Sequence, residues 1–205
     1  MKPIKVVGFD CDGVLFDTRQ ANRAYYNRIL NHFGKTAMTD EQFTFIHMHT
    51  LDESLCYLFP DQESLKAVHD YRRTMDYRWY LQLLTIEPYL ISLLKKIRPK
   101  WKTAIATNRT DTMNQLLAEF GIDRYFDLIV TSTDVERPKP HPDALLKVLD
   151  YFDIEPQDAI YIGDSKLDEL AAAAAGIPLV AYRNQDLSSP YHIQSLKDLE
   201  QLLKV

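Results

Sequence analysis

Two hydrophobic periods alternate along this chain, and the change between them predicts its organisation. At the start and again from residue 87 onward, short apolar runs rich in β-branched residues alternate with amphipathic helical segments. Between residues 18 and 86 the apolar positions recur at three-to-four spacing, which is typical of helices. The pattern predicts a core domain made of residues 1–17 and 87–205, with a helical domain of residues 18–86 inserted into it.

Within the core domain, the short apolar runs predict buried strands. These runs are residues 4–9, 102–106, 127–131, 159–162 and 178–182. The segments between and after them have helical periodicity, at residues 89–97, 112–120, 142–152, 171–175 and about 196–203. Strands that alternate with helices predict an α/β fold, a Rossmann-like doubly wound parallel sheet with helices on both faces.

The inserted segment predicts helices only. One helix is expected from Ala21 to Phe33, and a short one over residues 42–47 with a cap at Thr39-Asp40. A third begins after Pro60 and continues as a long amphipathic stretch to Trp79. We expect this all-helical insertion to form a cap domain over a site at the end of the first strand.

Composition limits the possible partners. The net charge of −5 argues against a nucleic-acid partner, and no apolar stretch reaches the ~20 residues needed to cross a membrane. Residues 1–4 run directly into a strand pattern, so no signal peptide is expected. Cys11 and Cys56 lack metal-binding spacing, and a cytoplasmic protein is expected, a monomer or a weak homodimer.

Candidate chemistry is concentrated in four short signatures, each placed at or near the end of a predicted strand. They are Phe9-Asp10-Cys11-Asp12-Gly13-Val14-Leu15, Thr107-Asn108, Arg137-Pro138-Lys139-Pro140 and Gly163-Asp164-Ser165-Lys166-Leu167-Asp168. Ligands of parallel sheets bind at the carboxyl ends of the strands. The four signatures are therefore expected to form one site.

The acidic residues of this site predict a metal ion. Asp10 and Asp12 are two apart on an extended segment, so their side chains point the same way and repel each other unless a cation lies between them. Asp164 and Asp168 add further carboxylates at the same edge. A hard divalent ion such as Mg²⁺ prefers this all-oxygen set.

Each signature also has a simpler explanation when it is taken alone. The acidic pair could be a solvated turn, and Thr107-Asn108 or Asp164 could serve only to form a turn. Lys139 could be an ordinary surface lysine, although the prolines on either side favour a fixed backbone. Their order along the chain and their shared position at strand ends favour the functional interpretation.

Together the motifs resemble those of the haloacid dehalogenase superfamily, in the branch with a helical cap inserted after the first motif. That branch includes phosphoglycolate phosphatase-like and β-phosphoglucomutase-like enzymes. The resemblance covers essentially the whole chain, and it rests on residues 9–18, Thr107-Asn108, residues 137–142, residues 163–168 and the Ala-rich helix that ends at Gly176-Ile177-Pro178. The motifs are specific for the superfamily but not for a substrate.

The resemblance implies a catalytic role for several residues. Asp10 would attack phosphorus and form an aspartyl-phosphate, and Asp12 would act as general acid and then as base. Thr107 and the amide of Asn108 would bind the phosphoryl group, and Lys139 would neutralise its charge.

For the metal, the resemblance implies that Asp10, the backbone carbonyl of Asp12, and Asp164 hold Mg²⁺. Asp168 would support them, directly or through water. Dehalogenases and phosphonate-cleaving members of the superfamily lack the second acid, so Asp12 argues for a phosphate-ester substrate.

These observations predict a Mg²⁺-dependent phosphatase that acts on a small phosphorylated metabolite. One alternative is a sugar phosphomutase, which keeps the same pair of acids. A weaker alternative is a non-catalytic binding module on the same fold, although no motif residue is lost.

The inserted segment is expected to select the substrate. His47-Met48-His49-Thr50 lies where related enzymes often carry a glycine-containing substrate loop. We expect His49 or His47, with Arg72 or Arg73, to contact the leaving group, although the arginines fit a solvated helix face equally well. Arg109 could line the mouth of the pocket or form a salt bridge within its loop.

Overall fold

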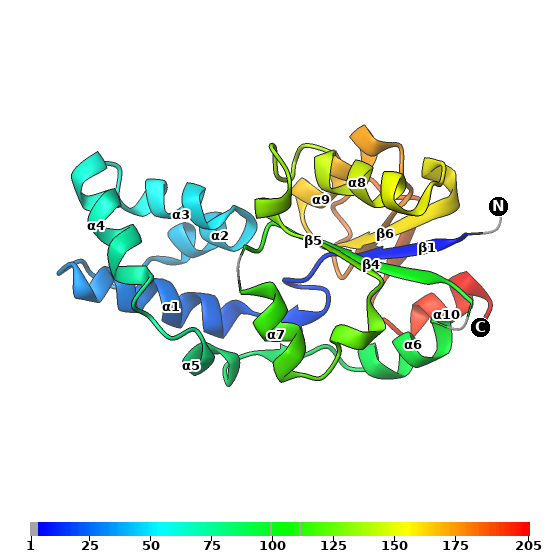
Figure 1. The fold of residues 1–205 in the computed structure, drawn as a ribbon, viewed down its shortest axis with the longest axis horizontal. Coiled ribbons are helices and arrows are strands. Elements are labelled where there is room, and N and C mark those ends of the chain that lie inside the picture. The colour runs from blue at the N-terminus through cyan, green and yellow to red at the C-terminus, as the bar shows by residue number, and fades with distance from the viewer. Residues whose placement is uncertain (1–3, 99, 111) are drawn as a thin grey trace. The chain divides into compact units, whose positions relative to one another are not determined.

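The structure of the chain is a computed structural model that describes residues 4–98, 100–110 and 112–205. The residues at the very start, on which the expectation of no signal peptide depends, lie outside this description. The chain divides into two compact units, Met1–Phe16 with Ile86–Val205, and Asp17–Thr85. The first unit combines strands and helices, and the second is built mainly of helices (Figure 1).

A six-stranded sheet forms the centre of the α/β unit, with the strand order β5-β4-β1-β6-β7-β8. The strands are β1 (Val6–Phe9), β4 (Lys102–Ala106), β5 (Leu128–Val130), β6 (Ala159–Gly163), β7 (Leu179–Tyr182) and β8 (Tyr191–Ile193). Neighbouring strands are parallel, and Phe9 at the end of β1 lies opposite Ile105 on one side and Ile162 on the other. The predicted parallel sheet is confirmed.

Helices cover both faces of this sheet (Figure 1). They are α6 (Leu90–Ile97), α7 (Met113–Glu119), α8 (Asp143–Phe152), α9 (Lys166–Ala175) and α10 (Asp198–Leu203), with short 3₁₀ turns at Asp123–Tyr125, Ser132–Asp134 and Pro156–Asp158. Helices α8 and α9 lie on one face, and α6, α7 and α10 lie on the other. The doubly wound arrangement is therefore also confirmed.

The alanines of α9 let it pack closely on the sheet. Ala171, Ala172 and Ala175 are buried in one cluster with Leu145 of α8 and Tyr161 of β6. Small side chains bring the helix backbone close to the strands, so the first turn of α9 lies beside the end of β6. That placement brings residues of α9 to the carboxyl edge of the sheet.

The helical unit contains five helices in the part of the chain that the structure describes. They are α1 (Arg19–His32), α2 (Asp40–Met48), α3 (Leu51–Leu58), α4 (Gln62–Arg72) and α5 (Arg78–Leu81). Their apolar faces enclose a separate core that includes Ile29, Leu55, Phe59 and Val68. Across the described residues, no helix has both the length and the apolar character needed to span a membrane.

The helical unit differs from the sequence pattern in two places. The pattern did not predict α3, which begins after Thr50 because the Thr50 hydroxyl accepts from the Glu53 backbone N–H and the Glu53 carboxylate accepts from the Thr50 N–H. The long stretch expected to reach Trp79 is broken after Arg72, where α4 ends. A new turn of helix, α5, starts at Arg78, whose backbone N–H donates to the Asp76 side chain.

Two very short strands lie where the chain passes from one unit to the other. Strand β2 (Phe16–Asp17) pairs with strand β3 (Thr85–Ile86) in a separate two-stranded sheet. The boundary between the units falls inside both strands. Two-residue strands carry no measurable period, which explains why the sequence pattern did not reveal them.

Candidate active site

The predicted site residues of the α/β unit meet at the carboxyl edge of its sheet, around the end of β1. Strand β1 lies between β4 and β6, which continue the sheet in opposite directions. Asp10 follows β1, Thr107 follows β4, and Asp164 follows β6. This is the switch point at which open parallel sheets bind their ligands.

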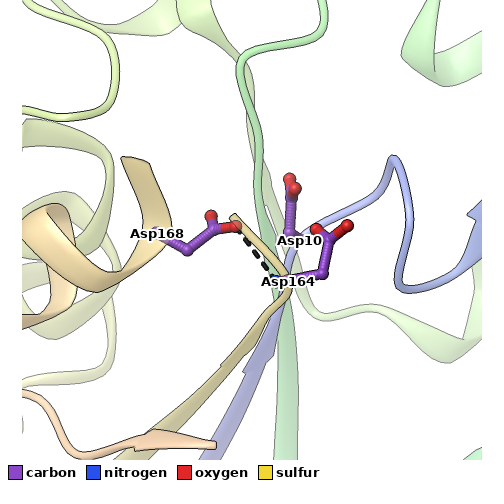
Figure 2. Close-up of side chains that lie close together, drawn as sticks. All are labelled: Asp10, Asp164 and Asp168. Carbon is purple, nitrogen blue, oxygen red and sulfur yellow. Dashed lines mark hydrogen bonds between the residues drawn. The ribbon is translucent and has the colours of Figure 1, made fainter. Parts of the chain in front are cut away.

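Three carboxylates form the centre of the cluster (Figure 2). One oxygen each of Asp10, Asp164 and Asp168 lies within 4.8 Å of the others. Burial raises the pKa of Asp10 to about 7, and the charges of Asp168 and Asp12 act in the same direction while Lys139 opposes them. Burial, with the charges of Asp168 and Asp10, also holds the pKa of Asp164 well above its usual range.

Asp168 differs from the other two acids because donors of the chain surround both of its oxygens. Its Oδ2 accepts from the Asp164 backbone N–H at 3.2 Å, the Ser165 N–H at 3.0 Å and the Ser165 hydroxyl at 2.6 Å. Its Oδ1 lies 2.7 Å from Lys139 Nζ and 3.0 Å from the Tyr161 hydroxyl. Burial alone would raise the pKa of Asp168, but the charge and hydrogen bonds of Lys139 and Ser165 outweigh it and lower that pKa.

Lys139 is buried among oxygen atoms. Its Nζ lies 2.8 Å from Asp10 Oδ1, 2.7 Å from Asp168 Oδ1 and 3.0 Å from the Tyr161 hydroxyl. Only 3% of its side chain is exposed, so the ammonium is fixed between the two acids and is not a surface charge. Although burial opposes it, the charges of Asp10 and Asp168 raise the pKa of Lys139, which keeps the ammonium charged.

Tyr161 is a member of the cluster that the sequence motifs did not identify. Its hydroxyl donates to the carbonyl of Ala106 at 2.7 Å and accepts from Lys139 Nζ. It thereby connects the end of β4 to the lysine. A tyrosine in the middle of a fully buried strand was the available signal, because a buried phenol hydroxyl needs a polar partner.

The Asn108 side chain joins two loops of the site. Its Nδ2 donates to the Lys139 carbonyl at 2.9 Å, and its Oδ1 accepts from the Lys139 N–H at 2.9 Å. The side chain therefore positions Lys139. Thr107 is buried in the same loop, and its hydroxyl accepts from the Arg109 N–H at 3.3 Å.

Asp12 and Arg109 form a two-pronged ion pair. Nε of Arg109 donates to Asp12 Oδ2 at 3.2 Å, and Nη2 donates to Asp12 Oδ1 at 3.0 Å. The salt bridge of Arg109 is not within its own loop, because its partner is Asp12, a predicted catalytic acid in the loop after β1. The Asp12 side chain thus lies with Arg109, apart from the three clustered carboxylates.

Two glycines allow the acids to approach the backbone. A Cβ at Gly13 would lie 2.1 Å from Asp164 Oδ2, and the φ angle of Gly13 is +82°, which side chains disfavour. A Cβ at Gly163 would lie 2.4 Å from the Cβ of Asp168. Any larger residue at either position would push a carboxylate out of the cluster.

The donor set fits a hard divalent cation. It consists of carboxylate oxygens alone, and burial together with the neighbouring carboxylates raises the pKa values of Asp10 and Asp164, so a bound cation would stabilise their charged forms. The oxygens of Asp168 already accept from four donors, the Lys139 ammonium, the backbone N–H groups of Asp164 and Ser165, and the Ser165 hydroxyl. Asp10 and Asp164 are therefore the side chains best placed to bind a metal directly, and Asp168 supports them.

The predicted residues His49, His47 and Arg73 make contacts within the helical unit itself. Nδ1 of His49 lies 2.7 Å from the Phe45 carbonyl, and its ring stacks on Phe45 at 3.8 Å. Nδ1 of His47 lies 3.3 Å from the Asn22 amide nitrogen, in the same unit. Arg73 pairs with Asp70 on the surface of its own helix.

Comparison with known proteins identifies the family. A model of haloacid dehalogenase-like hydrolases matches residues 7–182. The putative pyrophosphatase PpaX of Caldanaerobacter subterraneus subsp. tengcongensis is 28% identical over 98% of this chain and 94% of its own length. Phosphoglycolate phosphatase of Escherichia coli K12 is 39% identical over a shorter region, 46% of this chain and 41% of that enzyme.

Solved structures agree with this result. A haloacid dehalogenase-superfamily hydrolase of subfamily IA from Geobacter sulfurreducens is 35% identical, with a TM-score of 0.80 over 98% of this chain and 96% of that one. A predicted phosphoglycolate phosphatase from Haemophilus somnus shares the fold, with a TM-score of 0.85 at 19% identity over 98% of this chain and 99% of its own. The chain therefore belongs to the haloacid dehalogenase-like hydrolases, and the predicted class of enzyme, a phosphoric monoester hydrolase, is confirmed.

Proposed function

We propose that this haloacid dehalogenase-like hydrolase is a Mg²⁺-dependent phosphatase for a small phosphorylated metabolite. The observation that carries the proposal is the group of buried Asp10, Lys139 and Asp168 with half-buried Asp164 at the switch point of the sheet. Its charges are arranged for a dianionic phosphoryl group and a cation together. Residues 1–17 and 87–205 would form the catalytic domain and residues 18–86 the cap.

Mg²⁺ would be held by Asp10, Asp164 and the backbone carbonyl of Asp12, with Asp168 in support. When bound, it would compensate the charge of the carboxylates and of the phosphoryl oxygens. Lys139 would supply the second positive charge, because its ammonium is already fixed 2.8 Å from Asp10.

In the first half of the reaction, a carboxylate oxygen of Asp10 attacks the phosphorus atom. The bond from phosphorus to the leaving oxygen breaks, and Asp12 donates a proton to that oxygen. Thr107 and the backbone amide of Asn108 bind the phosphoryl oxygens during this transfer. The products are an aspartyl-phosphate on Asp10 and the free alcohol or acid.

In the second half, a water oxygen attacks the same phosphorus atom and Asp12 takes up one of its protons. The bond from phosphorus to Asp10 breaks, which releases inorganic phosphate and restores the carboxylate. Each turnover therefore consumes one water molecule, and Asp12 returns to its starting protonation state.

The helical unit would select the metabolite, with His49 as a contact to the leaving group and His47, Arg72 or Arg73 as possible neighbours. This unit is rich in aromatic side chains, which pack in its core and stack on its histidines. The names of the relatives make pyrophosphate and phosphoglycolate the first compounds to test.

A panel of phosphorylated metabolites tests the proposal, with phosphate release measured with Mg²⁺ and with EDTA. Hydrolysis that needs the metal and is abolished in Asp10→Asn is the expected result. An isomer formed from a sugar 1-phosphate without free phosphate would instead indicate a phosphomutase. No turnover of any compound would favour a binding module.

A further inference from the structure

We propose that Arg109 binds an anionic group on the leaving part of the substrate. This group would replace the Asp12 carboxylate as the ion-pair partner of the guanidinium. The inference rests on the proposed function and narrows its substrate class. Preferred substrates would be small phosphate esters or anhydrides whose leaving group carries a carboxylate or a phosphate close to the bond that breaks.

The geometry of the ion pair carries this inference. Nε and Nη2 of Arg109 contact the two oxygens of Asp12 at 3.2 and 3.0 Å, so the planar guanidinium presents a two-pronged fork to a flat anion. The same fork fits a carboxylate or a phosphate of a ligand, because both offer two oxygens at similar spacing. Asp12 occupies this fork in the structure.

The backbone that carries this guanidinium is anchored on both sides. The Arg109 N–H donates to the Thr107 hydroxyl at 3.3 Å, and its carbonyl accepts from the Ser132 N–H at 3.1 Å. Nη1 of Arg109 donates to the Thr112 hydroxyl at 3.1 Å. The fork is thereby fixed to the loop of Thr107, which is proposed to bind the transferring phosphoryl group, and it lies next to the proposed proton donor.

A substrate anion would free Asp12 from its ion pair with Arg109, so that Asp12 can donate a proton. Both Asp12 oxygens are engaged by Arg109, whereas proton donation requires that one of them contact the leaving oxygen. If Asp12 turns away, the guanidinium loses this two-pronged contact, and only 6% of the Arg109 side chain is exposed to water. Breaking a buried ion pair is costly, so an anion that takes the place of Asp12 makes this change favourable.

The other cation of the site does not fill this role. Lys139 is already held by Asp10, Asp168 and Tyr161. Lys139 would therefore face the transferring phosphoryl group, while Arg109 would face the group that leaves. A substrate with a negative charge on each side of the breaking bond matches both cations.

Two substrates that differ only in this charge test the inference. They are 2-phosphoglycolate and 2-phosphoglycolamide, whose leaving groups carry a carboxylate and a neutral amide. The wild-type kcat/KM should be higher for the carboxylate. In Arg109→Gln the ratio of the two kcat/KM values should fall about 10- to 100-fold, as expected for the loss of a charge-assisted contact, and Arg109→Lys should keep part of it.

Arg98→Gln is the matched control. Arg98 pairs with Asp127, which precedes β5 at the opposite edge of the sheet, so its removal should leave the ratio unchanged. Equal losses for both substrates in Arg109→Gln would overturn the inference, because they would mean that Arg109 only orients Asp12. If Arg109→Gln does not fold, two other measurements test the inference. The first is the ratio of the two kcat/KM values in Arg109→Lys. The second is the affinity of both compounds for the Asp10→Asn and Asp10→Asn/Arg109→Lys proteins, measured by calorimetry.

The result also separates this inference from the proposed function. If the wild-type protein with Mg²⁺ releases no phosphate from any compound of the panel, the phosphatase proposal fails. If it releases phosphate but the ratio does not depend on Arg109, only the inference fails.

Discussion

The two units of this chain bury different kinds of side chain. In the α/β unit, Asp10, Lys139 and Asp168 are all buried and charged, and they hold one another in place. In the helical unit the core is apolar and aromatic, and buried polar residues such as Thr50 and Ser54 serve helix ends or backbone carbonyls. In the α/β unit the same charged side chains serve both stability and catalysis, so a substitution there should affect both. In the helical unit a substitution should be able to change one without the other.

Replacing Asp168 should lower both the stability of the α/β unit and its catalytic rate. Asp168→Asn removes a charge that compensates buried Lys139, and loss of one partner of a buried ion pair typically costs about 3–5 kcal/mol. Urea unfolding at pH 7 should show this loss, and kcat should fall at least about 100-fold because Lys139 is displaced. Asp143→Asn, in the more exposed pair with Arg137, should cost less than about 1 kcal/mol. Similar stabilities of the two variants would contradict the comparison.

A smaller change in the same network should affect kcat more than KM. Tyr161→Phe keeps the ring but removes the hydroxyl that connects Ala106 to Lys139, at a cost of about 1–3 kcal/mol. We expect kcat to fall about 10-fold with KM nearly unchanged, because the lysine is less firmly positioned. Tyr182→Phe, in strand β7, provides the control and should leave kcat unaltered. A kcat of Tyr161→Phe equal to that of the wild type would show that the hydroxyl serves only stability.

The raised pKa of Asp10 predicts how stability depends on pH without metal. The pKa rises on folding from 3.8 to about 7, so the folded state keeps a proton that the unfolded state releases between these values. The free energy of unfolding should therefore fall as pH rises through this window, and Asp164 acts in the same direction. Asp168 has a lowered pKa, so its contribution is lost only at more acidic pH.

Thermal unfolding in EDTA between pH 5 and 8 measures this dependence. Asp10→Asn should flatten the profile and unfold at a higher temperature than the wild type at pH 8. Mg²⁺ should raise the wild-type Tm most at the alkaline end. A wild-type Tm that climbs steadily from pH 5 to 8 in EDTA would exclude the proposed cause.

In the helical unit, a substitution should weaken substrate binding without slowing the catalytic step. His49→Ala should raise KM for the best substrate of the panel about 5- to 10-fold and leave kcat within about twofold, as expected when uniform binding is lost. His69→Ala, in helix α4 of the same unit, is the control and should change neither value. If His49→Ala lowers kcat and leaves KM unaltered, the division of labour between the units is wrong.

The smallest effect should come from a helix cap of the same unit. Thr39 accepts from the Gln42 backbone N–H at the start of α2, so Thr39→Ala should lower the free energy of unfolding by about 1 kcal/mol. Thr44→Ala, in the same helix, should change it by less than about 0.5 kcal/mol. Neither variant should alter kcat, and a change in kcat would show that stability and catalysis are coupled here too.

Much of the fold could be predicted from the sequence pattern, because β1, β4 and β6 are continuous apolar runs buried on both faces and each neighbouring helix buries one apolar face. Strand β8 was not predicted because its three residues, Tyr191–Ile193, form a polar edge strand with little apolar content. Helix α3 was missed because its signal is the cap at Thr50 and Glu53, which a search for periodicity does not detect.

The acids and the lysine of the candidate site could be recognised as motifs, since their order along the chain is itself a pattern. Their individual tasks could not. The engagement of Asp168 by four donors, the backbone contacts of the Asn108 side chain and the pairing of Arg109 with Asp12 all depend on loops that meet only in three dimensions. Sequence spacing has no access to such contacts.

The paired strands β2 and β3 have a consequence for how this chain can fold. Because residues 16–17 lie beside residues 85–86, the insertion leaves and re-enters the core at one point. Once β2 and β3 pair, the chain between β1 and β4 no longer behaves as one long open loop. Loop-closure entropy grows only with the logarithm of length, about 0.6 kcal/mol for each doubling, so an insertion of this size adds little to the cost of pairing β1 with β4. A helical unit attached in this way can be lengthened, shortened or exchanged during evolution with little penalty for the pairing of β1 with β4.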